Sequence, residues 1–257
     1  MEVSVVVTAF NAAQTIHASL QSVLNQDFND FEIIVVDDGS SDATVEVVQA
    51  IASPRIRLFT IEHRGRSAAL NHAIGFSSAE FIAIHDADDI SQTTRLSQQV
   101  ACLKRDLQID VLGGQMQATN GSRTWNLRFP AVNNKIQEVF DDGFMPLANP
   151  TVMFRRSWFT STSGYDTSCE RLEDLQLFFV HRKSTIFAAL DTDLVTYTFR
   201  TLDFQQWRAE ERDRLAITGT SHRTQPGPVG YLNYRVAVQA QKLGLGITRR
   251  SNIKRNS

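Results

Sequence analysis

Short apolar runs alternate with amphipathic stretches through the first 105 residues of the chain. Runs rich in Val, Ile and Phe predict four buried strands, at Val3–Ala9, Phe31–Val36, Ile56–Ile61 and Phe81–His85. After each run, apolar residues recur at helical spacing and predict a helix, within residues 16–24, 45–51, 70–75 and 96–103. Apolar strands that are each followed by a helix are typical of a parallel sheet with helices on both faces. The pattern therefore predicts an α/β fold with a mostly parallel central sheet.

The second half of the chain is less regular. Apolar segments predict strands at Val111–Met116, Trp125–Phe129 and Asn149–Phe154, and a pair of strands at Ile186–Leu190 and Leu194–Phe199. Helical spacing predicts helices at Ile136–Phe140 and Glu173–Val180. From Gln205 the chain is polar and helical in pattern, with a second helical stretch at Tyr231–Leu243 and a basic end. We therefore expect one α/β domain over residues 1–204 and a small helical C-terminal extension over residues 205–257.

Composition and charge exclude several classes of protein. The chain is 42% hydrophobic and 21% charged with a formal net charge of -2, so nothing indicates disorder or a nucleic-acid-binding protein. The two cysteines, Cys102 and Cys169, form no disulfide framework or metal-ligand spacing, which fits a reducing compartment. The N-terminus shows no signal-peptide pattern, and no apolar stretch approaches the roughly 20 residues of a membrane span. We therefore expect a cytoplasmic protein that contacts a membrane peripherally at most.

The stretch FIAIHDADD places three carboxylates directly after the fourth strand, at Asp86, Asp88 and Asp89. Three acids on one turn repel one another unless a positive charge lies among them, and their oxygens suit Mg²⁺ or Mn²⁺. The alternative is a solvated acidic turn that caps the next helix at Thr93 or Thr94. The stretch alone does not decide between a metal site and a helix cap.

The other predicted strands end in residues that would lie at the same edge of the sheet. In a parallel α/β sheet, ligands bind beyond the carboxyl ends of the strands. Thr8 and Ala9 close the first strand, and Asp38 follows the second. The carboxylate of Asp38 could accept a hydrogen bond from a base or a ribose, or it could serve a turn together with Gly39.

Two arginines, Arg64 and Arg66, flank Gly65 after the third strand. Their guanidinium groups could neutralise a diphosphate, or they could lie solvated at the surface. The first strand–helix turn, TAFNAA, contains no glycine-rich phosphate loop. A cation held by Asp86 and Asp88 is the natural substitute for such a loop, which favours the metal interpretation of the acidic turn.

Several motifs occur together and in order over residues 3–182. They are VSVVVTAFNAAQTI, SVLNQDFNDFEIIVVDDGSSD, GRSAALNHAIGFSSAEFIAIHDADD with Arg95–Leu96 beyond it, NPTVMFRR and RLEDLQLFF. In this combination the chain resembles the inverting glycosyltransferases of family 2, which bind a nucleotide-sugar on a GT-A fold with a Rossmann-like sheet. The family's usual proline before the Arg-Leu pair is replaced here by Thr93–Thr94. The Q-x-x-R-W motif of processive members is absent, so processive polysaccharide synthesis is not expected.

The resemblance implies roles for the residues at the strand ends. It assigns Thr8 and Ala9 to the nucleoside pocket, Asp38 to the base, which is usually uracil, and Arg66 to the ribose and phosphates. Residues 1–115 would then bind the nucleotide-sugar, and residues 116–204 would form the acceptor side.

The resemblance also divides the acids into donor-binding and catalytic groups. It implies that Asp86 faces the ribose or the sugar, that Asp88 binds Mn²⁺ or Mg²⁺, and that Asp89 supports them. It matches Asp174, in the Glu173–Asp174 pair, to the catalytic base. An acceptor hydroxyl has a pKa far above neutral and needs such a base. Without the resemblance, a helix N-cap is the ordinary use of an aspartate at this position.

The implied reaction is metal-dependent, inverting transfer of a sugar from a UDP-sugar to a hydroxyl of a glycan, a lipid-linked acceptor or another acceptor. Bacterial-type surface polysaccharide or glycoconjugate synthesis is the expected setting. A sugar nucleotidyltransferase and a non-catalytic nucleotide-sugar-binding protein remain alternatives, although the former needs a glycine-rich basic loop after the first strand. The basic end could contact anionic lipid at the inner face of the cell membrane, through Arg249, Arg250, Lys254 and Arg255.

Overall fold

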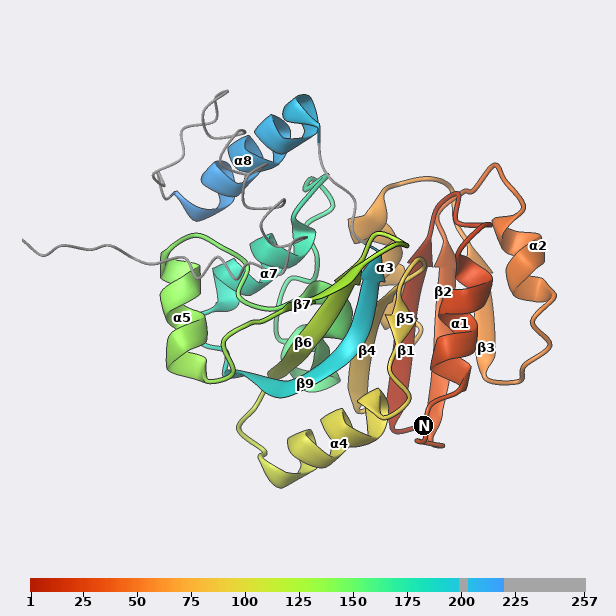
Figure 1. Ribbon diagram of the computed structural model, residues 1–257, viewed down its shortest axis with the longest axis horizontal. Helices are drawn as coiled ribbons and strands as arrows, with labels where there is room; N and C mark the ends of the chain where they lie inside the picture. The colour runs from red at the N-terminus through yellow and green to blue at the C-terminus, as the bar shows by residue number, and fades with distance from the viewer. Residues whose placement is uncertain (199–202, 220–257) are drawn as a thin grey trace, which may run out of the picture.

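The computed structural model describes residues 1–198 and 203–219 (Figure 1). The strands of this part of the chain are β1 (Val3–Ala9), β2 (Phe31–Asp37), β3 (Ile56–Thr60), β4 (Phe81–Asp86), β5 (Ile90–Ser91), β6 (Val111–Thr119), β7 (Thr124–Leu127), β8 (Met153–Arg155) and β9 (Phe187–Thr198). The helices are α1 (Ile16–Leu24), α2 (Thr44–Gln49), α3 (Arg66–Gly75), α4 (Arg95–Arg105), α5 (Asn133–Asp141), the 3₁₀ turn η1 (Asn149–Thr151), α6 (Arg156–Thr160), α7 (Glu173–His181) and α8 (Phe204–Thr218).

All of these strands join one sheet in the order β3-β2-β1-β4-β8-β6-β9-β5, with β7 paired to β6. Strands β3, β2, β1 and β4 are parallel, and β6 and β9 are parallel to each other. Strand β8 is antiparallel to both β4 and β6, and β5 is antiparallel to β9. The predicted α/β class with a mostly parallel central sheet is confirmed.

The sheet has an apolar core on each face because successive strand residues point to opposite sides. Val5 and Val7 of β1 join one core with α1, α2 and α4. Val6 of β1 and Ile84 of β4 join the other core with α3, α5 and α7. Figure 1 shows α1 and α3 on opposite faces of the sheet. Strands that are apolar throughout are therefore covered on both sides, as the sequence pattern requires.

Two strand predictions in the second half are wrong in detail. The pair predicted at Ile186–Leu190 and Leu194–Phe199 is the single strand β9 as far as Thr198, and Phe199 lies outside the described residues. The polar interruption between the predicted strands is an irregularity within β9 rather than a turn. The predicted strand at Asn149–Phe154 begins as the 3₁₀ turn η1, because proline suits the first helical positions, and becomes extended only at β8.

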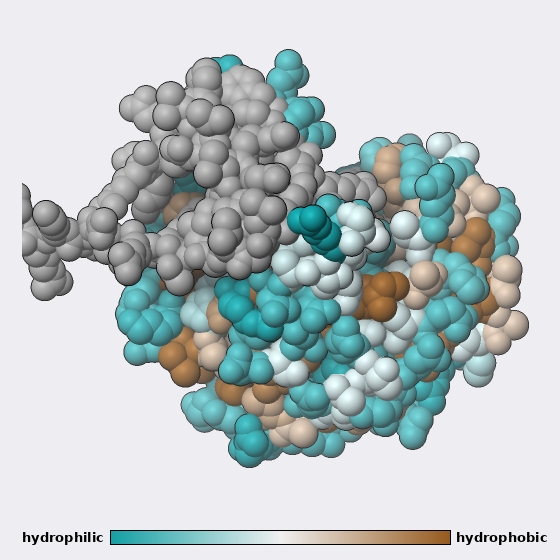
Figure 2. All heavy atoms as spheres, in the orientation of Figure 1, coloured by the Kyte–Doolittle hydropathy of each residue, from teal (hydrophilic) through white to brown (hydrophobic). Residues whose placement is uncertain are grey.

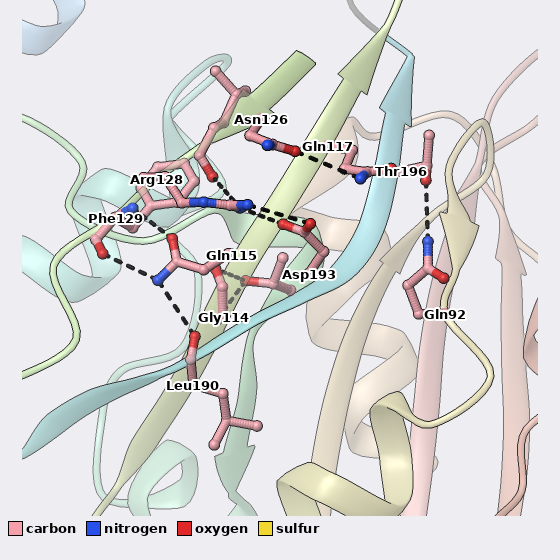
Figure 3. A network of polar contacts seen from close by, with 12 residues as sticks. Gln92, Gly114, Gln115, Gln117, Asn126, Arg128, Phe129, Leu190, Asp193 and Thr196 are labelled. Carbon is pink, nitrogen blue, oxygen red and sulfur yellow. Dashed lines mark hydrogen bonds and ion pairs between the residues drawn. The ribbon is translucent and has the colours of Figure 1, made fainter. Parts of the chain in front are cut away.

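Strand β9 stays continuous because its irregular centre packs closely against Gly114 of β6. The pairing register shifts on both sides of Gln115. A Cβ atom on Gly114 would lie 2.3 Å from Leu194 Cδ1, so this approach requires a residue without a side chain. Gln115 closes the irregularity, since its Nε2 donates to the carbonyls of Phe129 and Leu190 and its Oε1 accepts from the Phe129 N–H (Figure 3). The second half of β9 then continues to β5, which follows the acidic turn.

Helix α8 covers the start of the predicted C-terminal extension and packs against α7. Arg171, in the loop before α7, forms an ion pair with Asp213 of α8 at 2.7 Å. The helical stretch predicted at Tyr231–Leu243 and the basic end lie outside the described residues. The proposed boundary between residues 204 and 205 therefore stays a prediction.

Large exposed apolar side chains such as Phe10, Leu107 and Val180 come from separate elements. On the face shown in Figure 2, apolar residues are scattered among polar ones. Within residues 1–198 and 203–219, no helix combines the length and apolarity needed to cross a bilayer.

Candidate active site

A pocket of about 360 Å³ lies at the carboxyl ends of β1, β2 and β4. Six of the residues singled out from the sequence line it: Thr8, Ala9, Asp38, Arg66, Asp86 and Asp88. Parallel pairing sets Thr8 of β1 beside Asp86 of β4, and Ala9 beside Asp37 of β2. Arg66 enters the pocket as the first residue of α3. The strand ends therefore meet at one edge of the sheet, as parallel register requires.

Other residues that line the pocket had been assigned no role from the sequence. They are Phe10, Asn11, Ala12, Thr15, His63, Ala69 and Ala87. The rings of Phe10 and His63 stack with centroids 4.3 Å apart and planes inclined by 22°. Phe10 is 49% exposed although it directly follows a buried strand. A large aromatic residue at such a strand end is the signal that could have marked a surface for a planar ligand.

Asp38 is a buried carboxylate that organises the loop between β3 and α3. Its Oδ1 accepts from the Arg64 N–H at 2.9 Å, and its Oδ2 accepts from the Gly65 N–H at 3.0 Å. His63 Nδ1 also lies 2.9 Å from Oδ2. Gly65 has a φ of +88°, a conformation that residues with side chains rarely adopt. Because a carboxylate offers about four lone-pair sites, Asp38 can hold this loop and retain acceptor capacity for a ligand.

Arg66 connects the two halves of the chain at the pocket. Its Nη2 lies 2.5 Å from Asp86 Oδ1, and its Nη1 lies 3.3 Å from Thr8 Oγ1. Its Nε lies 2.6 Å from Oε1 of Glu173, at the start of α7. Burial opposes the charge of the guanidinium, but the carboxylates of Asp86 and Glu173 prevail and raise the pKa of Arg66. Arg66 is therefore a fixed cation in the pocket, whereas Arg64 does not line it.

The acidic turn after β4 holds its carboxylates in different settings. Asp86 and Asp88 line the pocket, whereas Asp89 is fully buried behind them. Asp89 Oδ1 accepts from the Thr198 N–H at 3.3 Å, and Thr198 Oγ1 donates to the carbonyl of Asp88 at 2.9 Å. Burial, together with Asp86 and Asp88, raises the pKa of Asp89 to about 8. The helix-cap alternative is not realised, since α4 begins without a side-chain cap.

The pocket-facing acids suit a hard divalent cation that is shared with a ligand. In the described part of the chain, no three His, Cys, Asp or Glu side chains gather into a complete metal-ligand set. Mg²⁺ in nucleotide sites is commonly held by one or two carboxylates, with phosphates and waters completing its shell. Asp86 and Asp88 provide such a pair of carboxylates. The donor set therefore fits Mg²⁺ or Mn²⁺ bound together with a diphosphate.

Asp174 lies in the first turn of α7, next to the pocket but not among its lining residues. Its neighbour Glu173 is buried and pairs with Arg66, which also pairs with Asp86, so Asp174 lies next in sequence to a chain of ion pairs that ends at the acidic turn. Burial and then the Glu173 carboxylate raise the pKa of Asp174 to about 7. The N–H of Leu175 bonds to Asp174 Oδ1 at 2.8 Å and lowers the pKa, but this effect is outweighed. A carboxyl group that titrates near neutral pH can serve as a general base.

Solved structures share the fold of this chain. The Staphylococcus aureus protein TarS (residues 1-349), in complex with UDP, superposes with a TM-score of 0.66 at 21% identity, over 84% of this chain and 66% of that chain. The mannosyltransferase PcManGT from Pyrobaculum calidifontis, in complex with GDP-Man and Mn²⁺, gives a TM-score of 0.62 at 19% identity, over 93% of this chain and 69% of that chain. The fold is that of the GT-A glycosyltransferases, which confirms the fold predicted from the motifs.

Residues 4–161 match the family model of Glycosyl transferase family 2. The chain belongs to glycosyl transferase family 2, so the resemblance drawn from the motifs is confirmed. One curated relative is the Escherichia coli UDP-Glc:alpha-D-GlcNAc-diphosphoundecaprenol beta-1,3-glucosyltransferase WfgD, which is 36% identical over 121 residues, 47% of each protein. The chain spans less than two thirds of the length of its first curated relatives, between 33% and 65%.

Proposed function

We propose that this chain is a metal-dependent, inverting glycosyltransferase that moves a sugar from a UDP-sugar to a hydroxyl group. The observation that carries the proposal is the meeting of Asp38, Arg66, Asp86 and Asp88 in one pocket, with Asp174 directly beside Glu173, the ion-pair partner of Arg66. These side chains provide partners for a base, a diphosphate, a cation and a hydroxyl proton.

The nucleoside of the donor would lie against Thr8 and Ala9, with its base at Asp38. The stacked rings of Phe10 and His63 support this arrangement, because they offer a flat surface in the same pocket. The complex of TarS with UDP supports a uridine donor. The GDP-Man in PcManGT makes guanosine the alternative that a donor screen should include.

Asp88 would hold Mn²⁺ or Mg²⁺, with Asp86 turned toward the ribose or the sugar. When bound, the cation supplies Lewis-acid stabilisation for the charge on the departing diphosphate. Arg66 adds a permanent positive charge in the same pocket, and its guanidinium can pair with phosphate oxygens. The Mn²⁺ in PcManGT supports the requirement for a divalent cation.

Asp174 would accept the proton of the acceptor hydroxyl. The hydroxyl oxygen forms a bond to the anomeric carbon while the bond to the diphosphate breaks on the opposite face, so the configuration inverts. A pKa of about 7 leaves a large ionised fraction at neutral pH and still provides useful basicity. Glu173 is a poorer candidate for the base because its carboxylate is occupied by Arg66 at 2.6 Å.

The acceptor would bind on the side formed by residues 116–204, and the donor on residues 1–115. The name of WfgD specifies a UDP-Glc donor, a diphosphoundecaprenol-linked acceptor and a β-1,3 product. A β product is what in-line displacement on an α-linked donor yields, which supports inversion. By this analogy we infer a role in surface polysaccharide or glycoconjugate synthesis in the cytoplasm, with a lipid-linked acceptor at the inner face of the membrane.

The decisive experiment separates donor binding from transfer. Calorimetry with UDP or GDP, with and without Mn²⁺, measures binding, and nucleotide release from UDP- and GDP-sugars with candidate acceptors measures transfer. Asp174→Asn is expected to lower kcat by about 10² to 10⁴-fold while UDP affinity stays within about twofold. Normal turnover by Asp174→Asn would contradict the base assignment. A wild-type chain that binds neither nucleotide in the presence of Mn²⁺ would contradict the donor assignment.

A further inference from the structure

We propose that Arg95 is a positioning residue that fixes the acidic turn of the pocket through His85 and Ser19. The proposal rests on the proposed function, in which this turn binds the cation and the donor. Arg95 is the first residue of α4, and only 1% of its side chain surface is exposed. It lies outside the donor pocket and touches none of the groups assigned to the reaction.

The guanidinium of Arg95 is buried and donates to neutral acceptors, while the carboxylates of Asp89 and Asp86 favour its charge at longer range. Its Nη2 donates to the carbonyl of Ile84 at 2.8 Å and to the carbonyl of Val152 at 3.4 Å. Its Nε donates to Gln99 Oε1 at 3.1 Å. Among the described residues, no carboxylate forms an ion pair with it. Burying a cation without a direct counter-ion costs folding free energy. We therefore attribute the hydrogen bonds of Arg95 to the positioning of neighbouring groups and not to a net gain in stability.

The hydrogen bonds from Arg95 to the acidic turn run in one direction. A guanidinium can only donate, so His85 Nδ1, which lies 3.3 Å from Arg95 Nη1, must accept. The ring of His85 then carries its single proton on Nε2, which lies 3.0 Å from Ser19 Oγ and donates to it. The hydroxyl of Ser19 donates in turn to the carbonyl of Asp86 at 2.9 Å. The chain of donors thus ends on the backbone where the acidic turn begins.

Helix α1 holds the rest of the same segment. Ser19 and Ser22 lie one turn apart on α1, and Gln26 follows just beyond its end. Ser22 Oγ accepts from the Ser91 N–H at 2.9 Å, and Gln26 Nε2 donates to the carbonyl of Gln92 at 2.7 Å. The segment from Asp86 to Gln92 is therefore bonded at three points to α1 and to Gln26 just beyond it.

These contacts matter because the acidic turn carries like charges. Asp86 and Asp88 carry like charges two residues apart, so without a divalent cation a free turn would separate the two carboxylates, even though Arg66 pairs with Asp86. The hydrogen bonds described above hold the backbone of the turn, so Asp86 and Asp88 are already in place before the cation binds. Groups that orient metal ligands in this way commonly contribute tenfold to 100-fold, by rough estimate, to metal affinity.

The test compares Arg95 with Arg155, a second and partly buried arginine that also donates to backbone carbonyls. Arg155 Nε donates to Ile109 at 2.9 Å, and its Nη2 donates to Leu103 at 2.6 Å. Arg155 pairs with Phe81 at the start of β4, whereas Arg95 contacts the end of that strand. Arg155→Met is therefore a matched control that removes similar bonds far from the acidic turn.

Hydrogen exchange of the ligand-free chain is the first measurement. Arg95→Met and Ser19→Ala are expected to speed exchange of the amides of residues 86–92 by about fivefold to tenfold, and Arg155→Met to leave them unchanged. Arg95→Lys, which keeps the charge but loses the planar fork, should restore the rate only in part. If Arg95→Met does not fold, Ser19→Ala carries the test alone. Equal effects of Arg95→Met and Arg155→Met on residues 86–92, or no effect of Ser19→Ala, overturn the proposal.

Calorimetry of UDP with Mn²⁺ is the second measurement. Arg95→Met and Ser19→Ala should weaken Mn²⁺-dependent binding by about tenfold, and Arg155→Met should not. Ser19→Ala could speed hydrogen exchange of the turn and yet leave the Mn²⁺-dependent affinity for UDP unchanged. That result would show that the position of the turn does not set nucleotide binding, and it would overturn this part of the proposal. If the wild-type chain binds no nucleotide, the proposed function fails, and the exchange result alone decides whether Arg95 fixes the turn.

Discussion

The two halves of the chain bring their side chains to the pocket by different means. In the first half, Thr8, Asp38 and Asp86 lie at the ends of parallel neighbours, so the strand register alone places them together. In the second half, Glu173 and Asp174 follow an irregular connection that ends at Leu172 with a φ of +58°. A sheet edge can be anticipated from strand pattern, whereas a loop-borne site depends on contacts that no local pattern reveals.

The largest expected effect concerns the first half. Asp88→Asn removes the pocket-facing carboxylate assigned to the cation, so Mn²⁺-dependent UDP affinity should fall by at least about 100-fold. Asp193→Asn makes the same change on β9, outside the pocket, and should leave the affinity unchanged. Calorimetry with both variants gives the comparison. Undiminished binding by Asp88→Asn would mean that the first half does not hold the cation through this residue.

The next effect concerns the second half, through the pKa of about 7 at Asp174. A base acts in its ionised form, so kcat should rise by about tenfold per pH unit below this pKa and level off above it. The folded pKa lies above the ordinary 3.8, so ionisation opposes folding. Stability of the wild type should therefore fall, relative to Asp174→Asn, as pH rises from about 4 to about 7. A kcat that stays constant through this range would exclude Asp174 as the base.

A smaller effect tests the crossing of β6 and β9. A Cβ on Gly114 would overlap the buried side chain of Leu194 at 2.3 Å, so Gly114→Ala should cost about 1–3 kcal/mol of folding free energy. Gly75, in the last turn of α3, has no atom within 4 Å of a built Cβ, and Gly75→Ala should be neutral or slightly stabilising. Denaturant unfolding measures both. Equal stability of the two variants would show that β9 moves aside without cost.

The smallest effect concerns the ion pair between Arg128 and Asp193 at the same irregularity (Figure 3). Both side chains are partly exposed, 49% and 23%, so the solvent screens their attraction. Arg128→Ala should lower stability by less than about 1 kcal/mol in thermal or denaturant unfolding. A loss above about 2 kcal/mol would indicate that this pair, and not Gln115 alone, keeps β9 in register.

The strands and the residues that meet at the edge of the sheet could be predicted because both follow from local pattern. Continuous apolar runs identified β1, β2 and β4, and the polar residues after them could only lie at one edge of a parallel sheet. The continuity of β9 could not be predicted, because its polar centre resembles a turn and is accommodated only by Gly114 on another strand.

The site was predicted incompletely for a related reason. The motifs pointed to Asp174 and Arg66 separately, but the bond between Arg66 and Glu173 joins residues 107 positions apart. The buried relay from Arg95 to Ser19 was also missed, since a polar residue inside a helix pattern carries no sign of its partner. Phe10 was missed because a single aromatic residue after a strand is usually core.

The ion pairs of Arg66 have a consequence for how a donor enters. Without a ligand, Arg66 serves as the counter-ion of Asp86 and Glu173, so the pocket already contains a cation. A donor that arrives with a divalent ion brings its own counter-ion for Asp86 and presents phosphate oxygens to Arg66. Under the proposed function, donor binding would be an exchange of ionic partners, in which each buried charge passes from one opposite charge to another without being left alone in a medium of low dielectric.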